Sequence, residues 1–152
     1  MKTVLIWLGA LLALGVLNLA IRQKEATLAG GETVYLKLAP VDPRSLMQGD
    51  YMVLNYAIAR ELRQEKLDAF GGHVVIELDG RAAATFVRLD DGSALAANER
   101  TLTYKNRRGA QFGIESFFFQ EGKGAAYADA EYAEIRLSPS GGAMLIGLVL
   151  AP

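Results

Sequence analysis

The chain contains no cysteine and only one histidine, His73, among its 152 residues. Disulfide bonds, cysteine nucleophiles and the common Cys and multi-His metal sites are therefore excluded. A Ser-His-Asp triad would have to use His73, which lies directly before the apolar run that begins at Val74. A histidine in that place is more typical of the surface end of a strand. We therefore expect no catalytic residues, no metal site and no cofactor.

Charge is also missing from residues 3–21, a run of nineteen uncharged residues that is followed by Arg22. A helix of this length spans roughly 28 Å, close to the hydrocarbon thickness of a bilayer. We expect residues 1–22 to form a single transmembrane anchor. The alternative is a cleaved signal peptide with its processing site at residues 27–29. The length of the apolar run, and the charges between it and that site, favour an uncleaved anchor.

The orientation of the anchor depends on few charges. The amino terminus and Lys2 flank one end and Arg22 and Lys24 flank the other, so the positive-inside rule is nearly balanced. A very short tail before a large domain is typical of a signal anchor whose domain is exported, and the absence of cysteine fits an envelope compartment. We expect a single-pass protein of the bacterial inner membrane with a periplasmic domain.

After the anchor, we interpret residues 23–31 as a short tether and residues 32–152 as one domain, since about 120 residues suit a single core. From Gly30 onward there are 13 Lys and Arg against 16 Asp and Glu, a net charge of −3 without charged blocks. This balance gives no electrostatic indication of nucleic acid as a partner.

Most of the domain shows the two-residue apolar alternation of β-strands, interrupted by Gly, Pro, Asn and Asp. Residues 60–70 consist instead of strong helix formers and are followed by two glycines. Asp79 and Gly80 indicate a tight hairpin turn. The predicted strands are residues 32–38, 51–59, 74–78, 83–89, 101–105, 112–119, 131–137 and 144–150. The expected fold is therefore mainly β with one substantial helix, as a small antiparallel barrel or a sandwich, preceded by the transmembrane helix.

Residues 49–56 read GDYMVLNY and fit the pattern G-D-Y-x-x-L-x-Y at every specified position. An Asp-Pro-Arg segment precedes the motif at residues 42–44, FFFQEGKG occupies residues 117–124, and a Gly-Gly pair precedes the last strand. Together these features resemble the GDYXXLXY family of membrane-anchored bacterial proteins over roughly residues 32–150. The resemblance implies an accessory partner of a multi-pass membrane protein, in a family whose biochemical activity is uncharacterised.

Side chains in a strand alternate between its two faces, and this divides the motif. Leu54 and Tyr56 fall on the apolar side, where we expect structural core residues. Tyr51 and Asn55 fall on the opposite side. With the polar residues of the preceding turn they form a candidate docking surface, which comprises Asp42, Arg44, Gly49, Asp50, Tyr51 and Asn55. The simpler alternative is a turn that leads into a core strand, with no binding role.

Two further segments bear on partners. Three consecutive phenylalanines, Phe117 to Phe119, place rings on both faces of their strand, so that strand is either central in its sheet or lines a partner interface. Lys105, Arg107 and Arg108 form a small basic cluster at a hairpin tip. We interpret that cluster as solvated, with contact to lipid headgroups as the alternative.

The function expected from these features is that of a non-enzymatic, membrane-anchored accessory subunit whose domain docks on a multi-pass membrane protein. A β-barrel module that binds a lipid or sugar is the alternative. A third is a relic of a hydrolase, because residues 46–54 are similar to the turn and strand of membrane-anchored signal peptidases of the serine and lysine type. That resemblance places Val41 where the nucleophilic serine belongs, and Ser45 is out of register.

Overall fold

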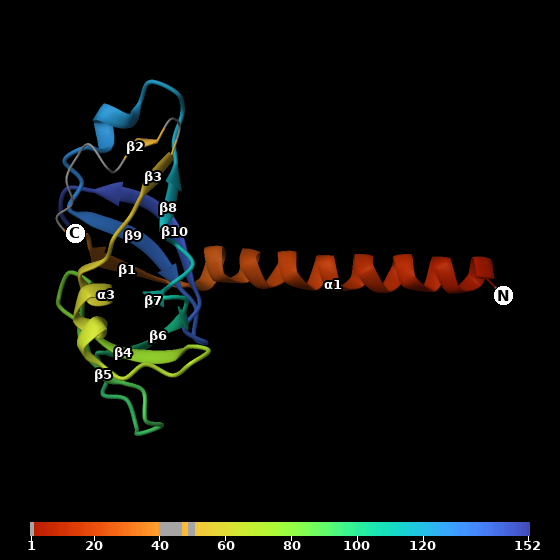
Figure 1. The fold of residues 1–152 in the computed structure, drawn as a ribbon, viewed down its shortest axis with the longest axis horizontal. Helices are drawn as coiled ribbons and strands as arrows, with labels where there is room; N and C mark the ends of the chain where they lie inside the picture. Colours follow the sequence, from red (N-terminus) through yellow and green to blue (C-terminus); the bar gives the residue numbers. More distant parts are fainter. Residues whose placement is uncertain (1, 40–46, 49–50) are drawn as a thin grey trace.

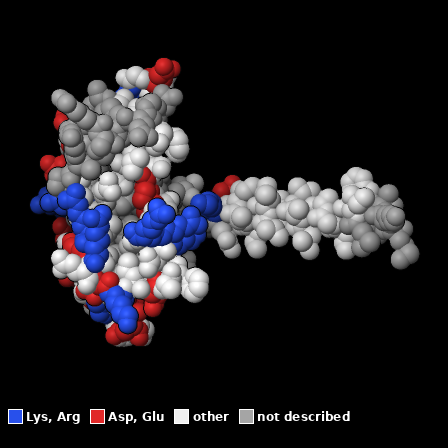
Figure 2. Space-filling view, viewed as in Figure 1, with Lys and Arg blue, Asp and Glu red and all other residues white. Residues whose placement is uncertain are grey.

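The computed structural model of the chain describes residues 2–39, 47–48 and 51–152. It consists of a long N-terminal helix, α1 (Lys2–Gly30), and a β-rich domain from which the helix projects (Figure 1). Apolar side chains surround α1, and Trp7 and Leu12 are each 70% exposed. Within the described chain, α1 is the one helix long and apolar enough to cross a membrane. Figure 2 shows acidic and basic side chains spread over the domain, while most of α1 shows neither.

The helix continues through the residues predicted as a tether. Residues 23–30 are helical, and only Gly31 separates α1 from the first strand, β1 (Glu32–Lys37). The Gly31 N–H donates to the carbonyl oxygen of Thr27 at 2.9 Å. The Gly31 carbonyl oxygen accepts from the guanidinium of Arg136 at 3.2 Å. A short, hydrogen-bonded connection of this kind fixes the end of the helix to the sheet.

Besides β1, six strands make up the larger sheet: β4 (Gly72–Leu78), β5 (Ala83–Leu89), β6 (Glu99–Asn106), β7 (Ala110–Gln111), β9 (Tyr132–Leu137) and β10 (Ala143–Val149). Their order is β10-β9-β1-β5-β4-β6-β7, with β1 and β5 parallel and the other neighbours antiparallel. Because β10 and β7 lie at the two ends of this order, the sheet is open. The predicted mainly β fold is confirmed as a sandwich-like arrangement, and the barrel alternative is not confirmed.

Three short strands form a second sheet in the order β2-β3-β8: β2 (Met47–Gln48), β3 (Tyr51–Val53) and β8 (Ser116–Phe118). The inward side chains of this sheet and of the larger one belong to a single hydrophobic core. Facing apolar layers of this kind are what hold two sheets together. The largest fully buried side chains of the core are Tyr56, Leu36, Leu62, Ile76, Leu102 and Ile135.

The helix predicted for residues 60–70 is wrong in its bounds. An α-helix, α3 (Ala57–Glu61), is followed by one 3-10 turn, η1 (Leu62–Gln64). Ile58 and Leu62 lie four residues apart on one face and are 2% and 0% exposed. Residues 63–66 are all exposed, so no apolar side chain extends that face and the helix ends. The strand predicted for residues 51–59 accordingly stops at Val53.

The strand predicted for residues 112–119 is interrupted. Residues 112–115 form an irregular turn between β7 and β8, with Gly113 at a φ of 80°. The Glu115 carboxylate accepts hydrogen bonds from the backbone N–H groups of Phe112 and Gly113. Phe112 and Ile114 are both buried, 7% and 5% exposed. Alternate burial also occurs in a strand, and for this reason the sequence pattern does not reveal the turn.

The hairpin turn predicted at Asp79 is present, but its left-handed residue is not glycine. Ala82 has a φ of 62° and donates its N–H to the Asp79 carbonyl oxygen at 3.0 Å. The Asp79 carboxylate accepts hydrogen bonds of 2.8 Å from the N–H groups of Arg81 and Ala83. These two bonds hold the turn in place and lower the pKa of the Asp79 carboxyl.

Candidate functional site

The described part of the motif runs from β3 into the residues before α3. β3 pairs with β2 on one side and β8 on the other, with Tyr51 opposite Phe118 and Val53 opposite Ser116. Four residues of the predicted docking surface lie outside the described residues: Asp42, Arg44, Gly49 and Asp50. Of that surface, only Tyr51 and Asn55 can be located. Tyr51 is half-buried and Asn55 is exposed.

The leucine and second tyrosine of the motif lie in the core, where Leu54 is 2% and Tyr56 1% exposed. The Tyr56 hydroxyl donates a hydrogen bond of 2.6 Å to the carbonyl oxygen of Ile114. Its ring meets the ring of Phe112 edge-on, with centroids 5.9 Å apart. Burial, and secondarily the Glu115 carboxylate, raise the pKa of Tyr56 well above its usual value of 10.0. The hydroxyl therefore remains protonated and keeps donating.

Glu115 connects the motif to the turn at residues 112–115 through both its backbone and its side chain. Its carbonyl oxygen accepts from the Leu54 N–H at 2.8 Å, while its carboxylate binds the N–H of Gly113 at 3.0 Å. In the sequence nothing distinguished Glu115 from the other glutamates. The one local signal was Gly113, a turn residue two positions earlier.

One face of the smaller sheet points away from the core and carries apolar side chains. Tyr51 and Phe118 face each other across β3 and β8, with ring centroids 5.8 Å apart. Phe118 is 74% exposed and Val53, which shares the face, is 37% exposed. We refer to Tyr51, Val53 and Phe118 as the β3–β8 patch.

The structure tests one of the two explanations for the three phenylalanines, that of a central strand. Phe117 and Phe119 pack around Tyr127, with centroid distances of 4.9 and 5.9 Å, so these rings have partners within the chain. β8 is the last strand in the order of its sheet, so among the described strands it is not central. Burial between strands therefore does not explain the outward ring of Phe118, and a partner interface stays a prediction.

A surface cleft of about 380 Å³ opens beside the motif. Leu38, Leu54 and Tyr127 contribute apolar walls, while Asn55 and Lys37 contribute polar groups. The volume lies within the range of small-molecule pockets, about 300–1,000 Å³. The cleft is open to solvent and lies between β1 and β3. It is not the interior of a barrel, as the ligand-binding alternative had assumed.

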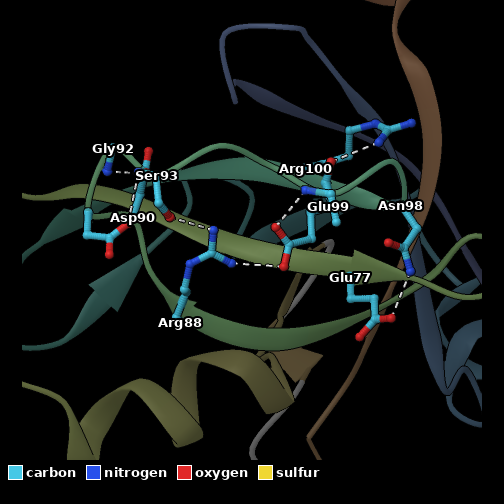
Figure 3. A network of polar contacts seen from close by, with 10 residues as sticks. Glu77, Arg88, Asp90, Gly92, Ser93, Asn98, Glu99 and Arg100 are labelled. Atoms are coloured by element: carbon cyan, nitrogen blue, oxygen red, sulfur yellow. Dashed lines mark hydrogen bonds and ion pairs between the residues drawn. The ribbon is translucent and has the colours of Figure 1, made fainter.

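Side-chain hydrogen bonds and one ion pair hold the loop after β5 in place (Figure 3). We refer to the side chains that make them, Arg88, Asp90, Asp91 and Glu99, as the loop brace. Asp90 and Asp91 use their carboxylates to accept the backbone N–H groups of Gly92 and Ser93, each at 3.0 Å. The Arg88 guanidinium beside them forms an ion pair of 2.8 Å with Glu99. With these carboxylates engaged in turn bonds beside a cation, the loop has a structural role.

His73 is exposed on β4, opposite Thr103. Ser45 and Val41, the positions relevant to a peptidase-like site, lie outside the described residues. Within the described ranges, no three His, Asp or Glu side chains converge as metal ligands.

Comparison with known proteins agrees with the motif. The sequence model of one family, described as GDYXXLXY protein, matches residues 13–148. Among curated proteins and among solved structures, nothing matches the chain. The matched region takes in the second half of the apolar helix and nearly all of the β-rich domain. Because the match covers most of the sequence, the chain belongs to the GDYXXLXY family.

Proposed function

We propose that this protein is a non-enzymatic accessory subunit of the bacterial inner membrane. α1 anchors it, the domain lies on the periplasmic side, and the β3–β8 patch docks on the extramembrane part of a multi-pass membrane protein. The observation that carries the proposal is the exposed aromatic surface formed by Phe118 and the motif residue Tyr51.

An exposed phenylalanine ring on an edge strand favours a protein partner on energetic grounds. Full burial of a phenylalanine side chain contributes about 1.5–3 kcal/mol relative to leaving it in water. Aromatic residues are also enriched among the few residues that supply most of the affinity of an interface. Phe118, at 74% exposure, has most of this contribution still available, and Val53 extends the apolar area beside it.

The anchor supports a partner in the same membrane. α1 has apolar side chains on all sides and leads into β1 through Gly31 alone. A domain connected so closely to its span stays near the bilayer surface. The most accessible partners there are other membrane proteins, whose extramembrane loops reach the same height.

The proposal is tested by photo-crosslinking in native membranes. A benzophenone amino acid is placed at Phe118 and, as the matched control, at Phe70, which is 94% exposed and lies outside the patch. We expect one multi-pass membrane protein to crosslink at position 118 and not at position 70. When that membrane protein is purified in turn, the wild-type chain should co-purify with it. A V53S/F118S variant should not co-purify. Equal crosslinking at both positions, or none at 118, would contradict the proposal.

A second candidate function, binding of a small lipid or sugar, is favoured by the cleft lined by Leu38, Leu54 and Tyr127. Mass spectrometry of organic extracts from the purified full-length chain tests it. A stoichiometric molecule that disappears when the cleft is filled by Asn55→Trp would support this function. An extract without such a molecule would leave protein docking as the better account.

A further inference from the structure

A second cleft lies where the helix joins the domain. It has a volume of about 320 Å³ and is lined by residues of α1, of β6 and β7, and of the turn between β9 and β10. Lys24 and Lys105 supply two ammonium groups to its wall. Thr103, Gln111 and Ser140 add hydroxyl and amide groups. Segments far apart in the sequence thus place two positive charges and several polar groups around one space.

The height of this cleft relative to a membrane follows from the helix. The uncharged run ends at Ile21, and Lys24 lies three residues beyond it, or about 4.5 Å along the axis. The headgroup layer is about 5–8 Å deep on each side of the hydrocarbon core. If α1 spans the bilayer, Lys24 therefore lies at the level of the phospholipid phosphates, and so does the cleft that it lines.

The basic groups around this junction lack anionic partners. Across the described parts of the chain, Lys24, Lys105, Arg107 and Arg108 form no ion pair, whereas Arg88 and Arg100 are paired with Glu99 and Glu32. Among the described residues that line the cleft there is no Asp or Glu. Glu25 follows Lys24 in the sequence, and the Glu115 carboxylate of the neighbouring cleft accepts backbone N–H groups.

Further basic side chains lie on the same domain. Figure 2 shows one group of Lys and Arg side chains at the base of α1 and separate groups elsewhere on the same face of the domain. A neighbouring cleft, which shares Gln111 with the first, is lined by Arg63, Arg107 and Arg108 together with Glu115. Anionic lipids attract basic groups held at the membrane surface, and a phosphate accepts hydrogen bonds from ammonium and hydroxyl groups.

We propose that the cleft between Lys24 and Lys105 binds the phosphate of an anionic phospholipid in the leaflet through which α1 leaves the membrane. The bound lipid then adds to the hydrogen-bonded connection that fixes the end of α1 to the domain. This inference rests on the membrane-spanning role of α1 in the proposed function. It does not depend on the identity of a protein partner.

The test uses native mass spectrometry of the full-length chain in mild detergent. Phosphatidylglycerol and phosphatidylcholine are added in equal amounts, and the ratio of the two bound lipids is measured. The variant is K24Q/K105Q. The matched control, K66Q/K123Q, removes two exposed lysines elsewhere on the domain. Circular dichroism verifies that both variants keep the fold, and carbonate extraction of membranes verifies that α1 is a membrane span.

We expect the wild type and K66Q/K123Q to prefer phosphatidylglycerol. K24Q/K105Q should lose about fivefold of this preference for each lysine, or about 25-fold in all. An equal loss in both variants, no preference in the wild type, or displacement of the lipid by millimolar inorganic phosphate would overturn the proposal. Release of the protein by carbonate would overturn the membrane anchor as well. An integral protein without the preference would overturn only the lipid site.

Discussion

The hydroxyl of Tyr56 donates a hydrogen bond of 2.6 Å to the carbonyl oxygen of Ile114, which lies 58 residues further along the chain. This bond joins the last residue of the GDYXXLXY motif to the irregular turn that precedes β8. The backbone bond between Leu54 and Glu115 runs alongside it at 2.8 Å. The second half of the motif therefore has a structural role, which is to hold β3 and β8 together. The first tyrosine, Tyr51, lies on the surface of the sheet so formed.

Replacement of Tyr56 by Phe should destabilise the domain by about 1–3 kcal/mol, because it leaves the buried Ile114 carbonyl without a donor. Urea denaturation of the full-length chain in detergent measures this loss. Tyr132→Phe is the matched control, since Tyr132 is half-buried on β9, and its change should remain within about 0.5 kcal/mol. Equal stability of the two variants would show that the bond contributes nothing to folding.

Gly31 should not tolerate a side chain, whereas its neighbour Gly30 should tolerate one. A Cβ at Gly31 would lie 2.4 Å from the Thr27 carbonyl oxygen and 3.1 Å from that of Leu137. A Cβ at Gly30, at the end of the helix, would meet no atom within 4 Å. We expect Gly31→Ala to lower the thermal midpoint by several degrees and Gly30→Ala to leave it unchanged or raise it, since alanine favours helix. Differential scanning fluorimetry distinguishes these outcomes.

The hairpin between β4 and β5 offers a stabilising substitution. Ala82 has a φ of 62°, a conformation that costs an L-residue roughly 1–2 kcal/mol and glycine almost nothing. Ala82→Gly should therefore raise the free energy of unfolding by about 0.5–1 kcal/mol after the greater chain entropy of glycine is subtracted. The matched control is Ala83→Gly, which should destabilise because Ala83 lies in a regular strand. A destabilised Ala82→Gly variant would contradict the turn geometry.

Protonation of Glu99 should contribute to the unfolding of the domain by acid. The Ala96 N–H, at 3.0 Å, and then Arg88 lower the pKa of the Glu99 carboxyl below its ordinary value of 4.5. Because the folded-state pKa is the lower one, the stabilisation is present above pH 4.5 and is lost as the pH falls through the folded-state value. Denaturation between pH 7 and 3 should therefore show a smaller loss for Glu99→Gln than for the wild type. An identical pH dependence would exclude a contribution from Glu99.

The sequence predicted elements correctly where one local pattern acts alone. The uncharged run of residues 3–21 gives a helix, and the alternating strands of the larger sheet lie close to their predicted bounds. The predictions failed at residues 51–70 and 112–119, where distant contacts compete with local preference. Because Ile58 and Leu62 pack in the core, α3 begins within the strand predicted for residues 51–59. The hydrogen bonds to the Glu115 carboxylate form a turn within the strand predicted for residues 112–119.

The candidate surfaces show the same division. The motif identified the family and placed Leu54 and Tyr56 on the apolar side, because side-chain alternation is a local property of a strand. The sequence did not show which of the three phenylalanines would face outward, since that depends on the register with β3 and on Tyr127. It also gave no reason to place Lys24 beside Lys105.

The sequence by itself determined an apolar N-terminal helix, a mainly β domain and membership of the GDYXXLXY family, because composition, period and a contiguous motif need no knowledge of distant contacts. Tertiary structure decided the rest. It made the sheet open, gave the exposed position to Phe118, and formed a cleft between the helix, β6, β7 and the last hairpin. Each of these depends on which strands pair and in which register, and pairing is set by the packing of one shared core.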